Sequence, residues 1–114
     1  MSETPADNPV EITVGQIELF CKNAMSAYVF EPNIANTWEA VITTLTAFLV
    51  LKWKQGLLSG TSPADAFSVA CGLGSTMTPM DILAGNLKVS INLALPGITE
   101  HTVVSITQQM HASA

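Results

Sequence analysis

Two cysteines and two histidines are the side chains of this chain best suited to covalent chemistry or metal binding. Cys21 and Cys71 lie far apart in the sequence, and His101 and His111 lie near its end. A nucleophilic cysteine needs a base such as histidine within hydrogen-bond reach, and a zinc site needs several ligands at short spacings. No spacing here brings a cysteine and a histidine together. We therefore predict no metal site and no nucleophilic site, and we interpret both cysteines as small buried thiols.

The aspartates and glycines that resemble catalytic or phosphate-binding motifs are better explained by local structure. Ser62-Pro63-Ala64-Asp65 and Thr78-Pro79-Met80-Asp81 each combine a capping hydroxyl, a proline and an acid, which is typical of a helix start. We expect Asp65 and Asp81 to accept backbone N–H groups there. Gly72-Leu73-Gly74 resembles the opening of a dinucleotide-binding loop, but the third glycine and the long following helix are missing. No catalytic residue and no cofactor-binding residue is predicted.

The composition favours buried interfaces and argues against nucleic acid as a partner. Among 114 residues, 48% are apolar and 11% are charged, so a free monomer would have little charged surface. The net charge is −5, with four lysines and no arginine. Because arginine is the usual reader of phosphates and bases, we expect no nucleic-acid binding. A compact monomer with a Thr/Ser/Asn-rich surface is the alternative to an assembling subunit.

No export segment and no membrane-spanning segment is expected. The first fifteen residues are polar and acidic, without the basic and apolar regions of a signal peptide. The most apolar run, from Ala40 to Leu51, is about twelve residues long, which is too short to cross a bilayer. These features predict a cytoplasmic location without membrane insertion. In the cytoplasm, Cys21 and Cys71 are expected to stay reduced, because disulfides are uncommon there.

Two stretches carry the spacing of apolar residues that is typical of helices. The first, from Gln16 to Tyr28, has one apolar face. The second is longer, begins at Asn33 or Asn36, either of which can cap it, and stops near Gly56. Its apolar stripe contains Trp38, Val41, Ile42, Leu45, Phe48, Leu49 and Trp53.

Four further segments have the alternation or the β-branched residues typical of strands. They are Val10 to Val14, Phe67 to Cys71, Asn86 to Leu95 and Thr102 to Gln109. We predict an α+β fold in which a small mixed or antiparallel sheet packs against two helices, one of them long, with extended terminal arms. Residues 1–15 are expected to form a flexible tail with a strand-forming arm, and residues 16–114 a single domain.

The segment from Thr102 to Gln109 is the most informative part of the chain. It carries no charge, no proline and no glycine, although natural sheet edges are usually protected by charges, prolines or bulges. A terminal strand of this kind is either covered within its own fold or pairs with another chain. Self-association through this strand is therefore the first hypothesis.

Several short segments follow one another in a characteristic order over residues 16–110. They are Phe30-Glu31-Pro32-Asn33, Trp38, Lys52 to Gly60, Ala66 to Val69, Cys71-Gly72, Ser75 to Thr78, Asp81 to Gly85, and Ser105 to Met110. This ordered set resembles the C-terminal domain of contractile tail sheath proteins. Those proteins form the sheath of contractile phage tails and of related bacterial contractile injection systems.

The resemblance implies a structural protein rather than an enzyme, without cofactors, whose arms pair with the sheets of neighbouring subunits around an inner tube. The arm residues that it implies are Val10, Ile12 and Val14 on the N-terminal side and Val103, Val104 and Ile106 on the C-terminal side. It also implies that Lys52 and Lys54 face the tube, although both lysines also complement the dipole of the long helix. The expected partners are further copies in a ring or helical homo-oligomer, the inner tube, and other sheath or baseplate proteins of a phage-tail-like particle.

The chain departs from the sheath pattern in ways that leave its position in such a particle open. It is several times shorter than a full sheath protein, and it lacks arginine. Thr99-Glu100-His101-Thr102 stands where the family commonly has Pro-Ala-Glu-Phe. We expect a minimal sheath subunit, or a collar, terminator or baseplate-side adaptor. The alternatives are a non-polymerising accessory module or assembly factor of the same apparatus, and a small enzyme with a pocket near Cys71.

Overall fold

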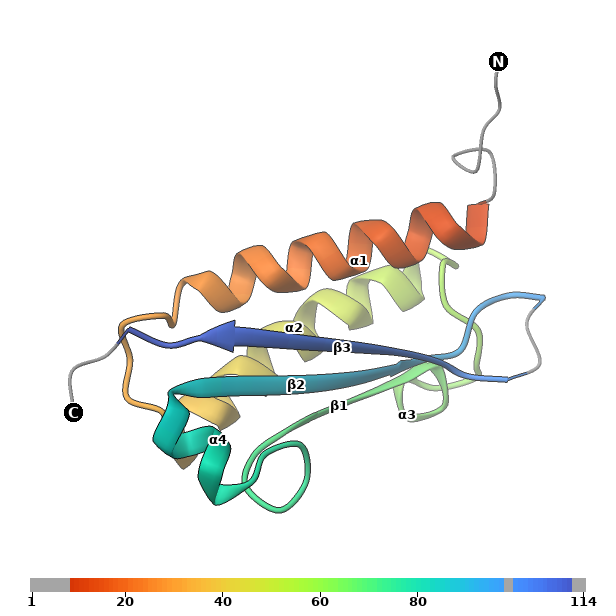
Figure 1. Cartoon of the computed structure of the whole chain (residues 1–114). Helices are drawn as coiled ribbons and strands as arrows, with labels where there is room; N and C mark the ends of the chain where they lie inside the picture. The colour runs from red at the N-terminus through yellow and green to blue at the C-terminus, as the bar shows by residue number, and fades with distance from the viewer. Residues whose placement is uncertain (1–8, 98–99, 112–114) are drawn as a thin grey trace.

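The structure, a computed structural model, describes residues 9–97 and 100–111 as a sheet layered against two long helices (Figure 1). The elements in chain order are α1 (Pro9–Ser26), α2 (Ala35–Lys54), α3 (Pro63–Ala66), β1 (Phe67–Cys71), α4 (Pro79–Ala84), β2 (Asn86–Leu93) and β3 (Thr102–Gln109). The predicted α+β class is confirmed. In the part of the chain that the structure describes, no helix is both long and apolar enough to cross a membrane.

The sheet is antiparallel, and β2 is its central strand in the order β1-β2-β3. β3 pairs along the whole of β2, from Asn86 opposite Gln109 to Leu93 opposite Thr102. Alternate residues of β2 are buried, as its apolar alternation predicted. A strand with one fully apolar face must lie where that face is covered, and the two helices cover it.

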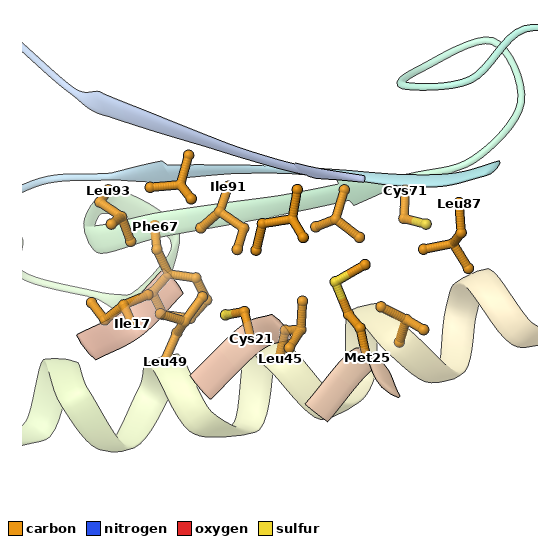
Figure 2. Close-up of a cluster of buried hydrophobic side chains, with 14 of the residues drawn as sticks. Ile17, Cys21, Met25, Leu45, Leu49, Phe67, Cys71, Leu87, Ile91 and Leu93 are labelled. Carbon is orange, nitrogen blue, oxygen red and sulfur yellow. The ribbon is translucent and has the colours of Figure 1, made fainter. Parts of the chain in front are cut away.

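The hydrophobic core lies between the sheet and the two helices (Figure 2). The helix residues at its centre are Ile17, Cys21 and Met25 of α1 and Val41, Leu45 and Leu49 of α2, each at most 1% exposed. Residues four apart lie on one face of a helix, so each helix presents a single stripe to the sheet. Burying each of the larger side chains contributes about 1.5–3 kcal/mol.

The N-terminal segment departs most from the sequence-based prediction. Val10 to Val14, predicted as a strand-like arm, lie within α1. Pro9 is the first helical residue, where a missing N–H costs little, and the helix supplies internal backbone bonds that a lone strand lacks. Gly15, inside the helix, weakens it by about 1 kcal/mol without ending it. The predicted tail of residues 1–8 lies outside the described residues.

The start of α2 is fixed by a side-chain network rather than by an asparagine cap. The N-cap residue is Ile34, which makes no side-chain capping bond, so the predicted capping by Asn33 or Asn36 is wrong. Instead, Asn33 Nδ2 donates to the Asn86 carbonyl at 2.9 Å, and Asn33 Oδ1 accepts from Trp38 Nε1 at 2.7 Å. These bonds connect the start of α2 to the start of β2.

The other end of α2 carries the second tryptophan. Trp53 Nε1 donates to the Gly60 carbonyl at 2.9 Å, which holds the chain that leaves α2 against the helix. Lys52 and Lys54 lie in the last turn, as predicted. The two indoles of the chain therefore lie at opposite ends of one helix.

The two short helices differ in how they begin. In α4, Thr78 and Asp81 form the predicted capping box: Thr78 N donates to Asp81 Oδ2 at 2.8 Å, and Asp81 N donates to Thr78 Oγ1 at 3.3 Å. In α3 the capping prediction is wrong. Ser62 makes no side-chain capping bond, and Asp65 accepts a hydrogen bond from Thr61 Oγ1 at 3.0 Å. This helix is a single turn that leads directly into β1, so the carboxylate bonds to the preceding loop.

Candidate assembly edge

β3 forms one edge of the sheet, and within the described residues no other strand pairs with its outer side. Its sequence, TVVSITQQ, contains no charged residue. The strand therefore lacks the charged side chains that often protect a natural sheet edge. Such an edge can accept a strand from another chain through main-chain hydrogen bonds.

The three predicted C-terminal arm residues are divided between the two faces of β3. Val104 and Ile106 are buried in the core of their own chain, whereas Val103 on the opposite face is 58% exposed. β3 is thus covered on one face by its own fold, which is one of the two arrangements expected for such a strand. The predicted N-terminal arm residues Val10, Ile12 and Val14 belong to α1 and not to the sheet.

Contacts that the sequence pattern did not reveal anchor the C-terminal end of β3. Gln108 Nε2 donates to the Met25 carbonyl of α1 at 2.7 Å, and Gln109 Nε2 donates to the Ala84 carbonyl of α4 at 2.9 Å. Met110, which follows the strand, is buried. The signal in the sequence was a polar residue, Gln108, at an inward position of an alternating strand.

The lysines predicted to face a tube have local contacts at the end of α2. Lys52 Nζ lies 5.1 Å from the centroid of the Phe48 ring, and that ring stacks on Phe20 of α1 at 3.7 Å between centroids. A cation above an aromatic ring is attracted by the negative face of the ring. The Phe20–Phe48 stack therefore joins α1 to α2. Lys52 contacts Phe48 from the next turn of the same helix, while Lys54 is exposed. Contact of either lysine with a tube stays a prediction.

Both cysteines are buried and neither forms a disulfide. Burial raises the pKa of Cys71 to about 11, and burial together with the charge of Glu18 raises the pKa of Cys21 to about 11. The thiolate is the nucleophilic form of cysteine. Near neutral pH, both side chains are therefore poor nucleophiles.

The register of the sheet also separates Cys71 from His101. Cys71 pairs with Val89, whereas His101 directly precedes Thr102, which pairs with Leu93. Val89 and Leu93 are about 13 Å apart along β2, at the usual rise of a strand. Cys71 and His101 therefore do not form a nucleophile–base pair. Among the described residues, no group of three or more His, Cys, Asp or Glu is placed to hold a metal ion.

Known proteins resemble this chain at the level of solved structures. No protein-family model matches it, and no curated protein matches it. A chain of the contracted sheath complex of the extracellular contractile injection system PVC is 39% identical over 81% of this chain, with a TM-score of 0.67. Chains of the anti-feeding prophage (AFP) baseplate are 34% identical over 83% of this chain, with TM-scores of 0.69 in the 6-fold symmetrised structure and 0.71 in the contracted state.

The chain is similar to one part of contractile injection system subunits. It spans about a quarter of the length of those chains, 25% or 26% in each comparison. The matched chains come from sheath and baseplate assemblies, so the similarity supports a structural role in such a system. To this extent the resemblance noted in the sequence is confirmed.

Proposed function

We propose that this chain is a structural subunit of a contractile tail or injection-system particle, and that neighbouring copies assemble around an inner tube by exchanging β3. It would act as a minimal sheath subunit, or as a collar or baseplate adaptor at one end of the sheath, in a particle built in the cytoplasm. The observation that carries this proposal is an uncharged terminal strand at a sheet edge, in a chain similar to sheath and baseplate chains.

Exchange of β3 would conserve the interactions that the strand makes in its own chain. If β3 of one copy replaces β3 of another, the same ladder with β2 and the same burial of Val104 and Ile106 form between two chains. The cost is then limited to association and to rearrangement of the connection between β2 and β3. That connection contains Pro96 and Gly97, and Gly97 has a φ of +80°, a backbone conformation that glycine adopts at little cost.

The other predicted contacts are secondary parts of the proposal. Val10, Ile12 and Val14 would join a neighbour's sheet only after the start of α1 unwinds, because they are helical in this structure. Lys52 and Lys54 would meet the tube from the end of α2. The experiment that tests the proposal is therefore designed on β3.

A disulfide that holds β3 in its own sheet tests the exchange within one protein. Ser90 and Ser105 pair directly between β2 and β3, and opposed Cβ atoms of this kind lie near the separation that a disulfide requires. Oxidised monomers of Ser90→Cys/Ser105→Cys are isolated and compared with the same protein after reduction, by light scattering and negative-stain electron microscopy. We expect rings, tubes or other large assemblies only after reduction, and the Ser90→Ala/Ser105→Ala control should assemble under both conditions.

Two outcomes would contradict the proposal. Equal assembly of the oxidised protein would exclude exchange of β3. A wild-type chain that stays monomeric under all conditions would exclude self-assembly and would favour the non-polymerising accessory module. The observation in favour of that second candidate is the anchoring of β3 in its own fold through Gln108 and Gln109.

A further inference from the structure

The apolar pattern of β3 does not by itself fix its register against β2. Val104 and Ile106 occupy inward positions, and a shift by one residue would turn both toward solvent. A shift by two residues keeps the same face inward and places one β-branched side chain where the other was. Contacts at the end of the strand must therefore distinguish registers that differ by two residues.

Gln108 continues the inward row of Val104 and Ile106, yet it is polar. Its Nε2 donates to the Met25 carbonyl at 2.7 Å. Met25 lies in the last turn of α1, where carbonyl groups have no partner further along the helix. This carbonyl also accepts from Tyr28 N in the following turn at 2.9 Å, so Gln108 uses its second lone pair. Gln108 thus caps the end of α1 from the sheet.

Gln109 points to the other side of the strand and caps a different helix. Its Nε2 donates at 2.9 Å to the carbonyl of Ala84, the last residue of α4. The backbone bonds of the α4 cap use the carbonyls of Asp81 and Ile82, which leaves the Ala84 carbonyl for the glutamine. The absence of a side chain at Gly85 leaves room for the Gln109 amide, because a Cβ at this position would lie 2.9 Å from Gln109 Nε2.

The next two residues extend the same attachment through the backbone. Met110 N donates to the Gly85 carbonyl at 2.7 Å, and His111 N donates to the Val29 carbonyl at 2.7 Å. The Met110 side chain is 7% exposed. Residues 108–111 therefore contact the end of α1, the turn after it and the cap of α4. A slip of two residues would break all of these contacts together.

We propose that Gln108, Gln109 and Met110 are a register lock, and that the carbonyl groups at the ends of α1 and α4 are the receptor for it. The receptor fits a strand that ends in Gln-Gln-Met, because two amide donors on opposite faces must meet two helix ends at once. The occupant is β3 of the same chain or, if the proposed function holds, β3 of a second copy. The lock selects this strand over a displaced one and over a strand that lacks the two glutamines.

Cysteine pairs between β2 and β3 measure the register directly. Ser90→Cys is combined in turn with Val103→Cys, Ser105→Cys and Thr107→Cys, because these β3 residues lie two apart on the exposed face. The yield of each disulfide is measured at equilibrium in a glutathione buffer. In the otherwise wild-type chain, we expect the disulfide at residue 105 to dominate.

Replacing both glutamines by methionine removes the two amide donors on which the lock depends and keeps the length of the side chains. In Gln108→Met/Gln109→Met, we expect the yield at residue 105 to fall several-fold and disulfides at residue 103 or 107 to rise. Gln16→Met, at an exposed position of α1, is the matched control and should leave the pattern unchanged. An unchanged preference for residue 105 in the double variant would overturn the lock. Each single variant, Gln108→Met or Gln109→Met, should show a smaller shift of disulfide yield away from residue 105. If the double variant does not fold, the two single variants provide the test.

The same samples separate the lock from the proposed function. On a non-reducing denaturing gel, a chain with an internal disulfide migrates as a monomer, whereas two chains joined by a disulfide migrate as a dimer. Disulfides found only within chains, all at residue 105, would contradict exchange and leave the lock intact. Disulfides between chains that spread over all three positions in the wild type would contradict the lock and leave exchange intact.

Discussion

Gly85 lies where the end of α4, the start of β2 and the end of β3 meet. It ends α4 with a φ of +79°, it directly precedes β2, and its carbonyl accepts from Met110 N. A side chain here would be strained by the left-handed backbone conformation. It would also collide with the Gln109 amide.

Gly85→Ala is expected to lower the free energy of unfolding by about 1–2 kcal/mol through backbone strain alone, with a further loss from displacement of Gln109. Urea denaturation measures this change. Gly15→Ala is the control, because a Cβ at Gly15 in α1 would meet nothing within 4 Å. Alanine is a better helix former than glycine, so this variant should gain about 0.5–1 kcal/mol. A stabilising effect of Gly85→Ala would contradict the account of this site.

At the scale of elements, one charged contact joins α4 to β2. Lys88 Nζ lies 2.9 Å from Asp81 Oδ1, while Asp81 Oδ2 caps α4 through Thr78 N. The hydrogen bond from Lys88, followed by the bond from the Thr78 backbone, lowers the pKa of Asp81. The carboxylate must therefore be ionised for the two elements to be held together fully.

The lowered pKa of Asp81 sets the sign of a pH dependence. Because the folded state holds this proton less tightly than the unfolded state, the stabilisation is complete at neutral pH. It is lost as pH falls through the ordinary aspartate range toward the lower folded pKa. We expect the difference in Tm between wild type and Asp81→Asn to be largest near pH 7 and to close in acid. When Lys88→Met is also present, the effect of Asp81→Asn on Tm at neutral pH should be smaller. An effect of Asp81→Asn on Tm that does not change with pH would contradict the role of the ionised Asp81 carboxylate.

Strands with a clear alternation or a β-branched run were predicted with nearly the bounds that they have, whereas side-chain contacts between distant segments were not predicted. β2 follows from its own alternation, and the α4 cap follows from the order of Thr78 and Asp81. Val10 to Val14 were assigned wrongly because a short β-branched run forms a strand only beside another strand.

The same limit applies to single side chains that bond to distant parts of the chain. Asn33 was expected to cap its own helix but bonds to Asn86, which is distant in the sequence. Gln108 and Gln109 bond to the ends of two helices that precede β3 by long stretches of chain. Neither role can be read from local spacing, because it depends on where the sheet places the end of β3.

At the scale of the whole molecule, the chain has few charges and a neutral sheet edge. The charged fraction is 11%, and the two salt bridges within the described residues, Lys22–Glu18 and Lys88–Asp81, do not involve β3. Association through β3 would therefore use main-chain hydrogen bonds and apolar contact, which salt screens little.

Assembly through β3 is accordingly expected to persist from roughly 0.05 M to 0.5 M NaCl, a range over which surface charge pairs are strongly screened. Sedimentation velocity of the full chain across this range measures the effect. Assemblies that dissociate at the high-salt end would point to charged contacts instead. Lys52 and Lys54 would then be the first residues to replace by glutamine.

The positions of the two tryptophans have an optical consequence. The indoles of Trp38 and Trp53 are hydrogen-bonded to Asn33 and Gly60 at the two ends of α2, and neither bond involves β3. Unfolding of the whole chain breaks both bonds and shifts the ultraviolet emission of both indoles to longer wavelength. Because neither bond has a partner in β3, we expect both to remain when β3 leaves its own sheet. Intrinsic fluorescence can therefore separate strand exchange from denaturation without an added dye.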